Sequence, residues 1–481
     1  MKKTLKIAGA VCLIVMSLFN FSCGGNSEKS DSTEKDDFPY RTAKTDVKTD
    51  GQLYADGFLN MPSYLWTERK TKDYGELDKG TAKGIFVETL ENEYAFAFVA
   101  LPENASKDNK VPAVVLVHGA TGTAFYDWAV AWAEKGYAAI AMDTEGKMPT
   151  EQTGINNSNY ADYRQSVENH GPEQSHFTDY ANDVTSQWSY HALAAVIACT
   201  TYISSLDCVD AARVGVTGVS YGGYLTCLAA AYDDRYAFAI PVYGTLANRY
   251  GSGPFAGYIN SNKAYGLDDE AQLSLNRTPM LMVTSENDTH FSLNSTLRTA
   301  KAAKADICVV PGLTHGHNQC LGVPEIFAFA DEICFGKTPT IRIISPADET
   351  GYMKVALPKG VNVAGADYYY TFDENLNAET IWNTIACDVN GGEIFAARHE
   401  LLFRDAGAHL PAQHVELGLN IDVQAAFVAD GDVAIADHLK DGVTVHAVLQ
   451  VRVAQVQQVC ELVVVRAALA GGGHDDHLPR G

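Results

Sequence analysis

One stretch, residues 213–231, constrains the fold of this chain more than any other. It starts as an apolar strand, passes through a Gly-x-Ser-x-Gly motif centred on Ser220, and continues as a run of small residues typical of a buried helix. A strand that turns directly into a helix holds the serine on a tight turn, where Gly218 and Gly222 leave room because they lack a Cβ. The pattern predicts Ser220 as a nucleophile facing the first N–H groups of the helix. The alternative is a glycine-rich turn whose serine only caps the helix.

Strands and helices alternate around this motif. Residues 111–117 form a continuous apolar run, which is typical of a strand buried on both faces. Residues 137–142 form another such run, and helical spacing over residues 124–135 separates the two. The alternation predicts an α/β fold with a doubly wound, mostly parallel sheet and right-handed crossovers. Two antiparallel strands are predicted within residues 84–101.

The same patterns place the remaining elements. Strands are predicted at residues 237–243, 279–284 and 306–310, and helices at residues 187–206, 293–304 and 323–335. Two long polar segments, residues 144–185 and 244–272, interrupt this rhythm. Segments of that length in a compact domain are usually functional or disordered. We expect residues 144–185 to be an insertion beside the active site, and both segments to supply polar and aromatic contacts to the substrate.

The acidic partner of the serine is expected near the end of a late strand. A serine hydroxyl becomes a nucleophile only when a base lies within hydrogen-bond reach and a third group orients that base. In a sheet of this kind the chain order is Ser, then Asp or Glu, then His. The strand at residues 279–284 runs into Ser-Glu-Asn-Asp, which predicts Asp288 as the acid. Glu286 is the competing candidate, and a plain Asn-Asp turn is the structural alternative.

The candidates for the base and for one oxyanion-hole donor lie in two loops that follow strands. The last strand is followed by two histidines, and His315 is the predicted base because Gly316 after it lets the loop turn toward the serine. His317 is the alternative. The backbone N–H groups of Tyr221 and Ala120 are the predicted oxyanion-hole donors, since one follows the nucleophile and the other follows the first buried strand. His118 is interpreted as a structural hydrogen-bonding residue.

Composition excludes several classes of function. The chain has 481 residues and a formal net charge of −23, which disfavours nucleic acid and anionic membrane surfaces as partners. Its ten cysteines show no spacing of a metal site, so no metal and no cofactor are predicted. Disulfide pairing and oligomeric state stay open.

Composition also divides the chain into domains. Residues 1–22 have the basic start and short apolar run of a signal peptide, and residues 23–50 read as a polar tether. Residues 51–336 are the predicted catalytic domain, and residues 340–397 alternate like a small β-sandwich. Residues 398–481 form an atypical tail without Tyr, Trp, Ser or Met. This tail is either a divergent last domain or a frameshifted or foreign translation that is not native-like.

Seven motifs together resemble the α/β-hydrolase superfamily, in its dienelactone-hydrolase and prolyl-oligopeptidase branch, near the acetylxylan-esterase-like proteins. They are His118-Gly119, residues 136–143, Gln187 to His191, Gly218 to Tyr224, Pro241 to Gly244, Asn287-Asp288 and His315-Gly316-His317. The likeness covers residues 84–335. It implies the α/β-hydrolase fold, a Ser220–Asp288–His315 triad and a C-terminal β-sandwich like the one predicted from residue 340.

Three functions are compatible with these residues. The leading hypothesis is a serine carboxylesterase that removes acetyl or similar small acyl groups from carbohydrates. The second is a serine peptidase of the prolyl-oligopeptidase type, although too few residues precede the catalytic domain for the propeller of such peptidases. The third is a non-catalytic surface binding lipoprotein, against which the complete triad argues.

The N-terminus predicts export. Ser22-Cys23-Gly24 resembles a bacterial lipoprotein cleavage site, which implies lipidation of Cys23 and anchoring to the cell envelope, in the periplasm or on the cell surface. Membrane contact is then expected only through this lipid. Simple secretion is the alternative.

Overall fold

The computed structural model describes two compact units of the chain. The described residues are 60–78, 80–151, 162–262, 267–336, 342–345, 352–356, 361–371, 376–390, 393–395, 422–425, 444–447 and 460–468. One unit comprises Tyr40–Pro339 with Asn375–Ile381, and the other comprises Met1–Pro39, Thr340–Glu374 and Trp382–Gly481. The predicted signal peptide, the tether and Cys23 lie outside the described residues.

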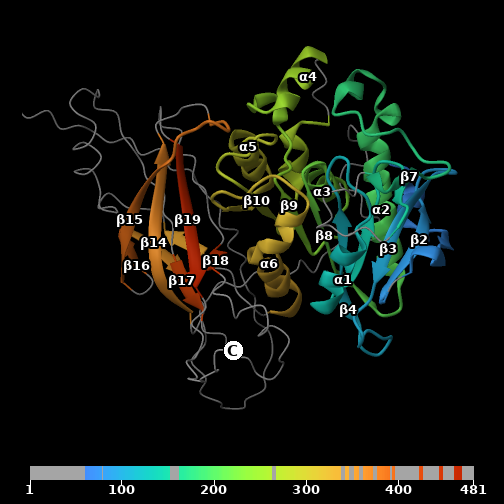
Figure 1. The fold of residues 1–481 in the computed structure, drawn as a ribbon, viewed down its shortest axis with the longest axis horizontal. Coiled ribbons are helices and arrows are strands. Elements are labelled where there is room, and N and C mark those ends of the chain that lie inside the picture. The colour runs from blue at the N-terminus through green and yellow to red at the C-terminus, as the bar shows by residue number, and fades with distance from the viewer. Residues whose placement is uncertain are drawn as a thin grey trace, which may run out of the picture. The chain divides into compact units, whose positions relative to one another are not determined.

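The first unit is built on a nine-stranded sheet (Figure 1). Its strands are β1 (Thr71–Asp73), β2 (Ala82–Glu88), β3 (Tyr94–Ala100), β4 (Val111–Val117), β5 (Ala138–Met142), β8 (Val209–Val219), β9 (Phe238–Val242), β10 (Leu281–Thr284) and β11 (Asp306–Val309). Their order is β1-β2-β3-β5-β4-β8-β9-β10-β11. The strands from β5 to β11 are parallel, and β1, β2 and β3 are antiparallel to their neighbours. The predicted doubly wound, mostly parallel sheet is confirmed.

In the described residues, six α-helices accompany this sheet: α1 (Tyr126–Glu134), α2 (Trp188–Ser205), α3 (Tyr221–Tyr232), α4 (Pro254–Asn262), α5 (Leu293–Ala303) and α6 (Pro324–Phe335). All but α4 were predicted from periodicity. On one side, Trp132 of α1 packs on Phe327 of α6 with ring centroids 4.7 Å apart. α2 and α3 meet through Tyr224, whose hydroxyl donates to Ser189 at 3.4 Å. All twelve residues of α3 are buried, which explains the small side chains after Ser220.

The two long polar segments contain structure that periodicity did not predict. Within residues 144–185 the chain forms a short hairpin of β6 (Lys147–Pro149) and β7 (Arg164–Ser166). Residues 244–272 were read as a loop, but they contain α4. That helix buries Phe255 and Ile259 while Tyr258 is exposed. Its apolar positions are too few for a helical pattern to stand out among the Gly, Asn and Tyr residues around it.

The second unit is all-β in its described residues. It has β12 (Arg342–Ser345), β13 (Tyr352–Ala356), β14 (Val361–Thr371), β15 (Asn383–Asn390), β16 (Glu393–Phe395), β17 (Asp422–Ala425), β18 (Thr444–Ala447) and β19 (Cys460–Ala468). The long strand β14 pairs with β15, β17 and β19. The change in composition at residue 398 therefore does not coincide with an edge of the sheet.

The described residues also bear on membranes and disulfides. Within them, no helix has both the length and the apolar character that a membrane crossing requires. Cys199, Cys208, Cys227, Cys308, Cys320 and Cys334 are free thiols. Burial raises the pKa of several of them, to about 12 for Cys334, so these thiols are protonated at neutral pH.

Glu325, at the start of α6, makes the stability of the first unit sensitive to pH. The residue is 2% exposed, and neither carboxyl oxygen has a partner in another described residue. Burial raises the pKa of Glu325 from 4.5 to about 8. A carboxyl whose pKa is raised in the folded state binds its proton more tightly there, so its contribution to stability is complete below pH 4.5 and is lost as the pH rises through 8.

Glu325→Gln is therefore expected to flatten this pH dependence. Each unit of pKa shift corresponds to about 1.4 kcal/mol, so the variant is expected to gain several kcal/mol of unfolding free energy relative to wild type between mildly acidic and mildly alkaline pH. Urea unfolding of both proteins over that range measures the difference. Parallel pH profiles for the two proteins would show that Glu325 is not a buried acid.

Candidate active site

Ser220 lies on a strained turn between β8 and α3. Its backbone has φ 57° and ψ −119°, a conformation that costs a non-glycine residue energy and that recurs at functional sites. The turn fits only because its neighbours lack side chains. A Cβ on Gly222 would lie 2.0 Å from the carbonyl oxygen of Val117, and one on Gly218 would lie 2.4 Å from that of Gly222. The sequence motif therefore has the steric cause predicted for it.

The structure brings together the three residues predicted from the chain order. His315 Nε2 lies 2.8 Å from Ser220 Oγ, and His315 Nδ1 lies 2.7 Å from Asp288 Oδ2. The Asp288 side chain is fully buried, while that of His315 is 15% exposed. Because a carboxylate only accepts, Nδ1 carries the proton toward Asp288 and Nε2 is left to accept the Ser220 hydroxyl. This is the geometry of a nucleophile, a base and a group that orients the base.

Asp288 is fixed by its own turn. Its Oδ1 accepts the backbone N–H groups of His290 at 2.9 Å and Phe291 at 2.7 Å. These bonds leave Oδ2 directed at His315. The competing acid, Glu286, instead accepts the N–H of Gly312 at 3.0 Å and 3.1 Å. Glu286 thus braces the start of the loop that carries His315 and does not itself contact the imidazole in the described residues.

His317, the alternative base, contacts a different part of the structure from His315. Its Nε2 accepts the N–H of Gly119 at 3.0 Å, so this nitrogen is unprotonated. Burial, together with the nearby His118, lowers the pKa of His317 to about 3. The side chain is therefore a neutral, buried acceptor that ties the histidine loop to the loop after β4. A Cβ on Gly122 would come within 2.7 Å of the same nitrogen, so the imidazole is closely packed there.

The loop after β4 carries Ala120, one of the two predicted oxyanion donors. The N–H groups on either side of it are used, because Gly119 donates to His317 and Thr121 donates to Glu145 at 2.8 Å. Within the described residues no hydrogen bond engages the Ala120 N–H. Tyr221 is the first residue of α3, so its N–H has no acceptor within the helix. Both N–H groups thus remain for a ligand.

His118 has the structural role interpreted from the sequence. It is 1% exposed, and its Nε2 accepts the N–H of Thr144 at 3.0 Å. Its Nδ1 lies 2.6 Å from the carbonyl oxygen of Gly119 and is therefore the protonated nitrogen. The imidazole bridges the ends of β4 and β5.

Two residues that the sequence did not single out hold the same loop. Glu145 Oε1 accepts the Thr121 N–H, and Arg164 Nη1 donates to Glu145 Oε2 at 2.9 Å and to the carbonyl oxygen of Gly122 at 2.8 Å. Thr121 has a φ of 61°, which is unfavourable for a β-branched residue and needs such support. Arg164 belongs to β7, so the insertion at residues 144–185 supports the loop after β4.

Aromatic side chains pack beside His315. The ring of Tyr221 lies 5.3 Å from Phe255 and 4.9 Å from Phe177, and Phe255 lies 5.2 Å from Phe291. Phe291 stacks parallel to His315 at 6.2 Å. Phe177 comes from the insertion and has a φ of 64°. Each of the two long polar segments therefore contributes an aromatic ring that packs on Tyr221, and their contact with substrate stays a prediction.

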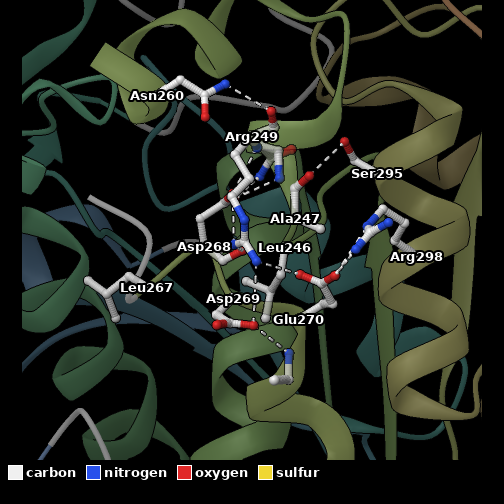
Figure 2. Close-up of polar contacts among 12 residues, drawn as sticks. Leu246, Ala247, Arg249, Asn260, Leu267, Asp268, Asp269, Glu270, Ser295 and Arg298 are labelled. Atoms are coloured by element: carbon white, nitrogen blue, oxygen red, sulfur yellow. Dashed lines mark hydrogen bonds and ion pairs between the residues drawn. The ribbon is translucent and has the colours of Figure 1, made fainter. Parts of the chain in front are cut away.

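The segment that carries α4 is held by ion pairs, as Figure 2 shows. The buried carboxylate of Asp268 accepts the N–H groups of Asn248 at 2.8 Å and Arg249 at 2.9 Å. Arg249 also donates to Glu270 at 3.2 Å, and Glu270 accepts from Arg298 of α5 at 2.7 Å. These polar residues therefore fix the segment to the domain, which positions Phe255 against Tyr221.

Part of this chain is similar to known proteins. Residues 76–250 match the family described as acetyl xylan esterase (AXE1). Two acetyl xylan esterases of known structure are similar: one from a Paenibacillus species has 18% identity, covers 61% of this chain and 97% of its own, and has a TM-score of 0.45. The other, from a Thermoanaerobacterium species, has 17% identity, 57% and 96% coverage, and a TM-score of 0.45.

A dienelactone hydrolase from Klebsiella pneumoniae is similar at 19% identity, with 53% and 90% coverage and a TM-score of 0.34. The strand order and the turn at Ser220 are observed in the structure of this chain and do not depend on any comparison. The family match includes both the loop after β4 and that turn. On these grounds the chain has the sheet order and nucleophile turn of an α/β-hydrolase fold, and it is similar to the acetyl xylan esterase family over residues 76–250.

Proposed function

We propose that this protein is a serine carboxylesterase that removes acetyl or similar small acyl groups from carbohydrates, with Ser220, His315 and Asp288 as its triad. The observation that supports this most directly is the chain of contacts from Asp288 through His315 to Ser220, at 2.7 Å and 2.8 Å. The match of residues 76–250 to an esterase family supports the acyl ester as the substrate class.

The proposed reaction has two halves. In the first, Ser220 Oγ attacks the ester carbonyl while its proton moves to His315 Nε2, and Asp288 stabilises the imidazolium that forms. The N–H groups of Ala120 and Tyr221 bind the oxyanion. The C–O bond to the alcohol then breaks, and His315 returns the proton to the leaving oxygen. In the second half a water molecule repeats these steps and releases the acid.

The site favours a small acyl group. Tyr221 and Phe255 are almost fully buried and Phe291 is fully buried, so the aromatic side of the site is filled by side chains packed against one another. An acetyl group needs little space beside His315, whereas a long acyl chain has to displace these rings. Closely packed aromatic rings resist displacement because each buries a large apolar area.

A comparison of substrates tests the proposal. We expect acetylated xylo-oligosaccharides and p-nitrophenyl acetate to be hydrolysed, and p-nitrophenyl octanoate to be a much poorer substrate. Peptide amides with a proline at the cleavage position are expected not to be cleaved. Efficient cleavage of such peptides, with weak activity on acetyl esters, would instead support the peptidase alternative, which the family match does not favour.

We further propose that the protein is exported and anchored through a lipid on Cys23, with secretion as the alternative. The support is the short apolar run followed by Ser22-Cys23-Gly24. Cys23→Ala is expected to move the protein from the membrane fraction to the soluble fraction of the envelope or to the medium. An unchanged membrane fraction for this variant would contradict lipid anchoring.

A further inference from the structure

A second histidine lies against the catalytic one. His290 follows Asp288 by two positions, and its ring centroid lies 4.5 Å from that of His315 at an interplanar angle of 32°. One ligand atom each from Asp288, His290 and His315 lie within 4.8 Å of one another. Among the described residues, no other trio of His, Cys, Asp or Glu side chains comes this close.

The imidazole of His290 is available to a ligand. The residue is exposed, and its Nδ1 lies 2.9 Å from the Thr289 hydroxyl. Its Nε2 makes no hydrogen bond within the described part of the chain. The net charge of −23 favours the approach of cations.

We propose that Asp288, His290 and His315 form a binding site for a divalent ion of the zinc type, and that binding there switches the esterase off. Two imidazoles and one carboxylate are a ligand set that suits zinc, with water in the fourth position on the exposed side. Magnesium and calcium prefer oxygen ligands and are not expected to bind.

Binding and catalysis exclude each other at this site. Both nitrogens of His315 are engaged, Nδ1 with Asp288 and Nε2 with Ser220. A metal that takes either nitrogen therefore removes either the orientation of the base or its contact with the nucleophile. Zinc bonds of about 2.0–2.2 Å place tetrahedral ligands roughly 3.5 Å apart, and the three ligand atoms here lie within 4.8 Å of one another.

Metal binding is measured by a method that does not depend on esterase activity. The inhibition rests on the proposed function, but the binding does not. Full-length Ser220→Ala protein, titrated calorimetrically with zinc, is expected to bind one ion per chain and to give no heat with magnesium. Adding His290→Phe, which keeps an aromatic ring and removes the ligand nitrogen, is expected to weaken zinc binding about tenfold or more. Unchanged affinity in the double variant would overturn the proposal.

Inhibition is then measured with active protein. Each variant's rate on p-nitrophenyl acetate with zinc is divided by its own rate without zinc, so differences in basal activity cancel. Wild type is expected to lose activity reversibly, with recovery on adding a chelator, and His290→Phe to need about tenfold more zinc. His176→Phe is the matched control, because His176 is exposed and contacts Tyr221 at 3.1 Å outside the trio. Equal zinc sensitivity in wild type and His290→Phe, or loss of sensitivity in His176→Phe, would overturn the proposal.

If zinc binds in a His290-dependent way but no ester is hydrolysed, the proposed function fails and the metal site remains. If ester hydrolysis proceeds but zinc neither binds nor inhibits, only the metal site fails. The two proposals are therefore separable.

Discussion

Ser220→Ala is expected to abolish ester hydrolysis, with a loss in kcat of about 10⁴-fold or more. The hydroxyl is the atom that the proposed mechanism bonds to the acyl group, and its only described partner is His315 Nε2. What remains after its removal is the stabilisation of the oxyanion by backbone N–H groups and substrate binding. Turnover of p-nitrophenyl acetate by the purified variant measures the loss.

The fold of this variant provides the control. Alanine has the same Cβ as serine, so the strained backbone at φ 57° is neither relieved nor worsened. The melting temperature is therefore expected to stay close to that of wild type. Near wild-type turnover in a well-folded Ser220→Ala protein would show that another residue is the nucleophile.

Alanine substitutions at the two histidines after β11 are expected to lower kcat to extents that differ by orders of magnitude. His315→Ala removes the group between Asp288 and Ser220 and is expected to lower kcat about as far as loss of the serine, because members of a triad act as a unit. His317→Ala removes only the acceptor of the Gly119 N–H. We expect a modest loss of kcat and a loss of about 1–3 kcal/mol in unfolding free energy, since a buried donor is left unpaired.

Kinetics and urea unfolding of both variants separate these roles. The expected pattern is a stable, inactive His315→Ala protein and a less stable, partly active His317→Ala protein. His317→Asn is a useful companion, because an amide oxygen is an alternative acceptor for the Gly119 N–H. An inactive His317→Ala protein of normal stability, alongside an active His315→Ala protein, would reverse the two assignments.

Much of the fold was predictable because its signals are local. The apolar run of β4 predicts a strand, because every residue in that strand is buried and is therefore apolar. The turn at Ser220 could be predicted from its glycines. A Cβ at those positions would clash with backbone that lies only a few residues away or on the adjacent strand. The helix α4 was missed because only Phe255 and Ile259 mark its inner face.

The candidate site was predictable in part, for a related reason. The sequence by itself determined the order along the chain of a serine, an acid and a histidine, each following a strand of the predicted parallel sheet. It could rank His315 over His317 only by the glycine that follows. What decides between them is tertiary: His317 meets Gly119, 198 positions away, and becomes a buried acceptor.

The support of the loop after β4 was decided by the tertiary structure alone. Arg164 is 42 positions from Gly122, and Glu145 is 24 positions from Thr121. Nothing in the residues around an arginine in a polar insertion tells which carbonyl it will meet, because no periodicity links the two. Local patterns thus predicted most strands of the large sheet, the turn at Ser220 and the candidate catalytic side chains. The contacts that orient these groups depend on how distant segments pack, and a single sequence carries no local signal for them.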